Sequence, residues 1–152
     1  MATARTILIT TGLALCLSLT VTAQEQKVNQ KDVPAPALAA ATKAYPKAQV
    51  KGWEKEIKDG KTLYEVTMAS GGAKWQVVFE ADGAFVAREE VIPVASLPAA
   101  VRDAVKAKYP KATLHSAEKI TRATTTEYEV GVKNAPKKEL VLTSDGKILS
   151  EE

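Results

Sequence analysis

Apolar and polar residues alternate in short runs along most of this chain, and turn residues separate the runs. In one run, Tyr64, Val66 and Met68 share one face of an extended strand, while Glu65 and Thr67 lie on the other. Strict alternation of this kind predicts strands that bury one face only. We expect eight strands, over residues 48–57, 62–69, 74–81, 84–91, 112–121, 126–133, 137–143 and 147–151.

Two segments repeat their apolar residues with helical spacing instead. The apolar stripes are Ala37, Ala40, Ala41 and Ala44 in the first segment, and Leu97, Val101, Ala104 and Val105 in the second. Asp32 and Ser96 are candidate N-caps. Both helices should end at a tyrosine, Tyr45 or Tyr109, because the proline that follows pushes the preceding residue out of the helical region.

The chain repeats itself with an offset of 64 residues. The sequence Tyr-Pro-Lys-Ala at 45–48 returns at 109–112, and the match extends to Thr62, Tyr64 and Glu65, which return as Thr126, Tyr128 and Glu129. An internal repeat decides the architecture before any single motif does. We therefore predict two modules of one kind, a first module over 33–92 and a second module over 93–152.

The predicted fold class is α+β, with two tandem modules that each pack one helix on a mostly antiparallel four-stranded sheet. The Asp-Gly pairs at 82–83 and 145–146 favour tight hairpins, which make neighbouring strands antiparallel. One helix covers one side of such a sheet and leaves the other side open. A lone four-stranded sheet exposes two edges, so we expect the two sheets to join edge to edge or the modules to pack closely.

These features resemble the PepSY-like domains, whose fold is that of the beta-lactamase inhibitor protein. The residues that carry the resemblance are Leu97 to Val101, Tyr109 to Ala112, Glu118, Lys119, Tyr128 to Val130, Asp145 and Gly146, with their counterparts in the first copy. The resemblance covers residues 33–152. It implies a secreted or periplasmic binding or inhibitory module rather than an enzyme, and it supplies no catalytic residues.

The N-terminal 23 residues have the pattern of a secretory signal peptide. Arg5 precedes an apolar run that ends in small residues at Ala23, where cleavage is expected. An uncleaved membrane anchor is the alternative, but the run is shorter than the ~20 residues that a membrane span needs. Cleavage removes Cys16, the only cysteine, and leaves residues 24–32 as a loose polar lead-in. The predicted location is periplasmic or secreted, with no stable membrane span after cleavage.

The exported part offers little chemistry. It carries 20 basic and 18 acidic residues, and this net charge of +2 is too small to favour a nucleic-acid partner. His115 is the only histidine, so no metal site with two imidazoles and no cysteine-histidine pair can form. The adjacent acids Glu89 and Glu90 point to opposite faces of a strand, and we interpret them as a solvated strand end. We predict no enzyme activity, no cofactor and no metal.

Candidate binding residues come from differences between the two copies. Trp53 matches Ala117, and Trp75 matches Lys138, so the repeated scaffold requires neither tryptophan. Alternation places Trp53 with Lys51 on the open side of the sheet, whereas Trp75 is expected to cap the core. Tryptophan is enriched at binding hot spots.

The predicted function follows from that open face. We expect an exported module that binds an envelope or secreted protein or peptide there, with the strand edges as a second candidate site. The candidate residues are Trp53, Lys51, Glu65, Gln76 and Trp75. The alternative is a small-ligand carrier or sensor whose ligand lies in an apolar pocket between the two modules.

Overall fold

The structure is a computed structural model that describes residues 26–58 and 60–152. The predicted signal peptide lies outside the described residues, as do the first two residues of the lead-in. The helical elements are η1 (Gln30–Asp32), α1 (Ala35–Ala44), η2 (Val94–Ser96) and α2 (Ala99–Lys108). The strands are β1 (Gln26–Val28), β2 (Gln49–Lys58), β3 (Lys61–Ser70), β4 (Ala73–Glu80), β5 (Phe85–Val91), β6 (Thr113–Thr121), β7 (Thr126–Lys133), β8 (Glu139–Thr143) and β9 (Ile148–Glu151).

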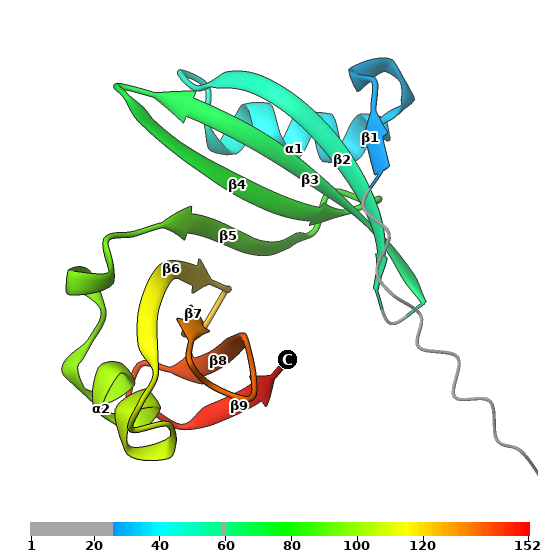
Figure 1. The fold of residues 1–152 in the computed structure, drawn as a ribbon. Coiled ribbons are helices and arrows are strands. Elements are labelled where there is room, and N and C mark those ends of the chain that lie inside the picture. The colour runs from blue at the N-terminus through cyan, green and yellow to red at the C-terminus, as the bar shows by residue number, and fades with distance from the viewer. Residues whose placement is uncertain (1–25, 59) are drawn as a thin grey trace, which may run out of the picture.

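The strands of the described residues form one antiparallel sheet in the order β1 to β9 (Figure 1). The α+β class is confirmed, and of the two arrangements that we considered for the sheets, the edge-to-edge one is found. The join is the pairing of β5 with β6, where Arg88 lies opposite Thr121 and Val91 opposite Glu118. The sheet has one strand more than predicted, because β1 in the lead-in segment pairs with β2, where Val28 lies opposite Trp53.

The helices begin and end next to prolines. Pro34 and Pro98 are the N-cap residues of α1 and α2, and no side chain caps either helix. The predicted caps were wrong, since Asp32 and Ser96 lie in the 3-10 turns η1 and η2 that precede the helices. The predicted helix ends are confirmed, because Tyr45 and Tyr109, which precede Pro46 and Pro110, are the C-cap residues.

Both helices cover the same face of the sheet. Val77 packs in the core beneath α1, and its cross-strand neighbours are Arg88 on β5 and then Thr121 on β6. Residues directly opposite one another in a sheet project to the same side. Ala117, which shares the parity of Thr121, is buried in the core beneath α2. The opposite side is called the helix-free face below.

The space between helix and sheet is filled by different side chains in the two modules. Helix α1 buries Ala37 and Ala41 where α2 buries the larger Val101 and Val105. The sheet beneath α1 compensates with Met68, Trp53, Trp75 and Phe79, where the second module has Val132, Ala117, Lys138 and Leu142. Close packing requires such compensation, since a small helix face leaves space that the sheet must fill.

The placement of Trp53 on the open side of the sheet was wrong. Trp53 is 4% exposed and lies in the core with α1, because it pairs with the core residue Val66. A β-bulge at Lys51 causes the error, since one extra residue reverses the alternation between Val50 and Trp53. The second module has the same bulge at His115, which puts Ala117 in the equivalent buried position.

Each helix also rests on a hairpin turn of its own module. A Cβ atom at Gly83 would lie 2.7 Å from the Pro36 carbonyl oxygen of α1, and one at Gly146 would lie 2.6 Å from the Ala100 carbonyl oxygen of α2. Both glycines have a positive φ, of 88° and 90°. The Asp-Gly pairs therefore serve two purposes, because they form the turn and let the helix backbone approach it.

Replacement of Trp53 by Ala should destabilise the protein by about 3–5 kcal/mol, because it removes a large buried side chain beneath a helix whose fully buried residues are the small Ala37 and Ala41. The matched control is Val50→Ala on the same strand, where the side chain is 43% exposed and the loss should stay below about 1 kcal/mol. Urea denaturation of the two variants measures the difference. Equal losses would contradict the buried position of Trp53.

Replacement of Gly83 or Gly146 by Ala should cost more than replacement of Gly72. All three glycines have a similar positive φ, which costs a residue with a Cβ roughly 1–2 kcal/mol, but Gly72 has no atom within 4 Å of the added Cβ. The clash with the helix carbonyl should add roughly 1–3 kcal/mol at the other two positions. Melting curves of the three single variants test this, and an equal cost at all three would rule out the helix contact.

Candidate binding face

The helix-free face is built from the residues that alternate with the core. Cross-strand pairing aligns them in rows that run from β2 to β8. Residues that project from this face include Glu54, Leu63, Glu65, Thr67, Gln76, Val78, Ala87, Glu89, Val91, Glu118, Ile120, Glu129, Glu139 and Val141. No described helix packs on them.

The centre of this face is apolar. Leu63, Val78 and Ala87 of the first module and Ile120 of the second form a cluster whose members are only 1–7% exposed. No described helix covers this cluster, and the partly buried Val86 packs against it. The cluster exists only where β5 meets β6, because its members come from both modules.

A hollow of about 430 Å³ opens beside this cluster. Its apolar lining consists of Leu63, Val78, Val86 and Ala87, and its polar lining consists of Glu56, Lys58, Lys61, Glu80, Glu89 and Arg122. Arg122 lies in the second module and the other lining residues lie in the first. The hollow therefore offers an apolar floor with charged side chains around it.

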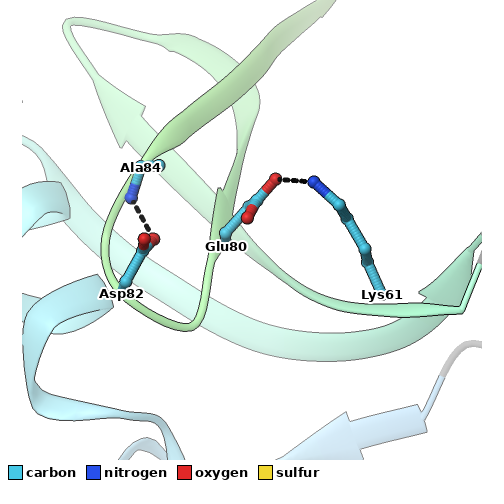
Figure 2. A network of polar contacts seen from close by, with 4 residues as sticks. All are labelled: Lys61, Glu80, Asp82 and Ala84. Atoms are coloured by element: carbon cyan, nitrogen blue, oxygen red, sulfur yellow. Dashed lines mark hydrogen bonds and ion pairs between the residues drawn. The ribbon is translucent and has the colours of Figure 1, made fainter.

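Part of the rim of this hollow is fixed by polar contacts (Figure 2). Lys61 at the start of β3 forms an ion pair with Glu80 at the end of β4, with 2.7 Å between Nζ and Oε1. In the adjoining turn, the Ala84 N–H donates a hydrogen bond of 2.9 Å to the Asp82 carboxylate. The turn that supports α1 thus also holds Glu80 at the edge of the hollow.

A group of carboxylates adjoins the apolar centre on the second module. Its members are Glu89 on β5, Glu118 on β6, Glu129 on β7 and Glu139 on β8, and these four residues are called the carboxylate cluster below. Glu118 and Glu129 are direct cross-strand partners. All four side chains are half-buried.

Burial and mutual repulsion shift the ionisation of this cluster. Burial raises the pKa of Glu129 to about 7, and the charges of Glu139, Glu118 and Glu89 and a hydrogen bond with Glu139 add to the effect. Burial also raises the pKa of Glu118, with contributions from Glu89 and Glu139. The charges of Glu89 and Glu139 thus act on both members of the Glu118–Glu129 pair.

The first module has the same framework with one carboxylate fewer. Glu54 and Glu65 are cross-strand partners, as Glu118 and Glu129 are in the second module. The Gln76 amide donates a hydrogen bond to Glu65, whereas the equivalent position in the second module is Glu139, a second carboxylate. The exchange of an amide for an acid at this one position distinguishes the two modules.

The structure places the predicted binding residues in different environments. Glu65 and Gln76 lie together on the helix-free face, next to the centre. Lys51 is exposed at the bulge, where its Nζ donates a hydrogen bond of 2.9 Å to Gln49. Trp53 and Trp75 are both in the core beneath α1, where the Trp75 ring lies 5.6 Å from that of Tyr45.

Sequence reasoning missed the carboxylate cluster. The interpretation of Glu89 and Glu90 as a solvated strand end was wrong, because the end of the first module is the middle of the continuous sheet and both side chains are half-buried. Their opposite orientation was right, since Glu89 pairs with Ile120 and Glu90 with Lys119. The signal in the sequence that could have indicated the cluster is the repeat, because it places Glu129 on the same face of the sheet as its counterpart Glu65.

The described residues give little support for other chemistry. Among residues 26–58 and 60–152, no group of three or more His, Cys, Asp or Glu side chains has a geometry that could hold a metal ion. The same part of the chain contains no helix with the length and hydropathy of a membrane span. The helix-free face, with its hollow and its carboxylates, is thus the candidate site.

Two family profiles match this chain. One, described as "Putative beta-lactamase-inhibitor-like, PepSY-like", matches residues 62–150, which is more than half of the sequence. The other, described as "Peptidase propeptide and YPEB domain", matches residues 35–83 and so covers most of the first module. No curated protein matches the chain.

Solved structures from Bacteroides species share the fold. A BLIP-like protein from Bacteroides fragilis has 26% identical residues and a TM-score of 0.60, over 78% of this chain and 85% of its own. A structure from Bacteroides eggerthii, described as one of its "putative periplasmic proteins", has 20% identity and a TM-score of 0.64, over 79% of this chain and 88% of its own. The second similarity supports the fold alone.

Replacement of Glu139 by Gln should stabilise the protein at pH 8 by about 1 kcal/mol and have little effect at pH 5. The pKa of Glu129 is raised from 4.5 to about 7 by folding, so its cost to stability is absent below about pH 4.5, grows as the pH rises and is fully present above about pH 7. The full shift would be worth about 3 kcal/mol, and half-exposure reduces it. Urea denaturation at both pH values measures the effect.

The reverse exchange in the first module is the matched control. Gln76→Glu replaces the amide beside Glu65 by a carboxylate and should lower stability at pH 8 relative to pH 5. An effect of Glu139→Gln that does not change with pH would contradict the coupling of Glu139 to Glu129.

Proposed function

The chain belongs to the PepSY-like, beta-lactamase-inhibitor-like family, and on this basis we propose that it is an exported, non-catalytic protein that binds another protein or a peptide on its helix-free face. The single observation that carries the proposal is the centre of that face. A hollow opens there beside a buried apolar cluster that no described helix covers, on a sheet whose other side is already occupied by both helices.

The surface composition supports a macromolecular partner. A face that combines an apolar centre with charged surroundings has the layout of a protein interface, in which a desolvated core is enclosed by a polar rim. Val91, which is 76% exposed, extends the apolar area next to Glu118. The candidates Glu65 and Gln76 belong to this face, whereas Trp53 and Trp75 act through the core that supports it.

A binding role without catalysis fits the family descriptions and the side chains. The descriptions name an inhibitor-like protein and a propeptide rather than a catalytic domain. The carboxylate cluster on the helix-free face consists of acids that repel one another, and the cations near it, Lys58, Lys61 and Arg122, line the hollow. The leader pattern of residues 1–23 supports action outside the cytoplasm, which is also how the Bacteroides eggerthii protein is described.

A small-ligand carrier is the second candidate function, and the hollow favours it. Its lining includes Arg122 from the second module as well as first-module residues, as expected for a site between the modules. Its volume of about 430 Å³ lies within the range of small-molecule sites. The hollow is open to the same face, so the two functions predict different occupants of one surface.

A photo-reactive phenylalanine analogue at position 91 should cross-link to a protein partner in the envelope of the producing cell, because this side chain is exposed beside the centre of the helix-free face. The matched control carries the analogue at Lys106, which is exposed on α2. Mass spectrometry of the adducts identifies the partner and the cross-linked peptide. Adducts from position 106 alone, or the same adducts from both positions, would reject the helix-free face.

A further inference from the structure

The hollow and the carboxylate cluster are two parts of one surface. Glu89 lines the hollow, and its charge also acts on Glu118 and Glu129. Its cross-strand partner Ile120 belongs to the apolar cluster at the centre of the face. A ligand that fills the hollow therefore contacts one member of the carboxylate cluster, and the other three extend from it across β6, β7 and β8.

The spacing of the strands sets the distance between the two parts. The hollow is lined by residues of β2 to β5 and by Arg122 directly after β6, and Glu118 and Glu129 lie on β6 and β7. Val91, which pairs with Glu118, lies four residues along β5 from Ala87, and neighbouring strands are about 4.8 Å apart, so the floor of the hollow and the Glu118–Glu129 pair are separated by roughly 15 Å. The side chains of residues two to four apart in a polypeptide span such a distance once the length of a lysine or arginine is included.

The electrostatics favour a cationic ligand. Four half-buried carboxylates repel one another, and a positive charge placed among them relieves that repulsion in a partly dehydrated site. An arginine or lysine side chain supplies the charge with several N–H donors for the carboxylate oxygens. A phosphate-bearing ligand would be repelled by the same groups, and the described residues do not form a metal-binding geometry.

We propose that the helix-free face binds a basic polypeptide segment of a partner protein. One aliphatic or aromatic side chain of the segment enters the hollow over Val78 and Ala87, and a neighbouring lysine or arginine lies on the carboxylate cluster. The inference rests on the proposed function and specifies the chemistry of the partner. Specificity comes from the pair, because the hollow selects the apolar residue and the cluster selects the cation at a fixed distance from it.

Synthetic peptides test this pairing. The full-length chain is expressed in ¹⁵N-labelled form, recovered after export and titrated at low salt with three capped decapeptides of glycine, serine and threonine. The first contains a phenylalanine flanked within four residues by two arginines, the second has glutamate in place of both arginines, and the third has alanine in place of phenylalanine. The first should shift the backbone amides of Val78, Ala87, Ile120 and Glu129, and the other two should bind at least tenfold more weakly.

Charge variants of the protein provide the second part of the test. The double variant Glu118→Gln, Glu129→Gln should bind the first peptide at least tenfold more weakly, and it should remain folded because it removes a repulsion. The matched control Asp103→Asn removes one negative charge from the exposed side of α2 and should leave binding unchanged.

Each negative outcome has a distinct meaning. Equal binding of the first and second peptides, or binding that is unaffected by the double variant, would overturn the role of the carboxylate cluster. No binding of any peptide would overturn the basic-segment proposal, and if position 91 still cross-links to a partner protein, the binding face itself stands. Absence of both peptide binding and cross-links from position 91 would overturn the proposed function as well.

Discussion

The fold and its candidate site depend on one backbone contact, the antiparallel pairing of β5 with β6. A module of ~60 residues buries a small fraction of its surface and leaves sheet edges exposed, so neither half is well stabilised alone. The pairing removes one edge from each module and makes one sheet of the whole described chain. It also puts both helices on the same side, because strand pairing fixes which side chains share a face.

The same contact creates the helix-free face as a chemical surface. Ala87 and Ile120 come from different modules and meet in one apolar cluster, and Glu89 meets Glu118 and Glu129 in one acidic cluster. The acidic cluster lowers the stability of the fold, because half-buried carboxylates of like charge disfavour the ionised, folded state at neutral pH. A local loss of stability that no packing contact offsets is typical of residues that serve binding rather than stability.

The repeat made most of the fold predictable, because each element appears twice and each copy supports the interpretation of the other. The eight predicted strands are all present, and the helices end at Tyr45 and Tyr109 as expected. The short strand β1 was not predictable, since its three residues acquire strand geometry only by pairing with β2. The orientation of Trp53 failed because alternation assumes an unbroken register, and the bulge at Lys51 breaks it.

The candidate site was harder to predict than the fold, and the reason lies in how differences between the copies are interpreted. Trp53 differs from Ala117 because α1 carries alanines where α2 carries valines, so this difference is a matter of packing. Glu139 differs from Gln76 without such compensation, because both lie on the helix-free face and each contacts the equivalent glutamate of its own module. The amide donates a hydrogen bond to its glutamate, whereas the acid adds a second negative charge beside its own. A difference that costs stability and fills no space in the core is the stronger indication of function, and it points to the second module as the side of the face that selects a positively charged partner.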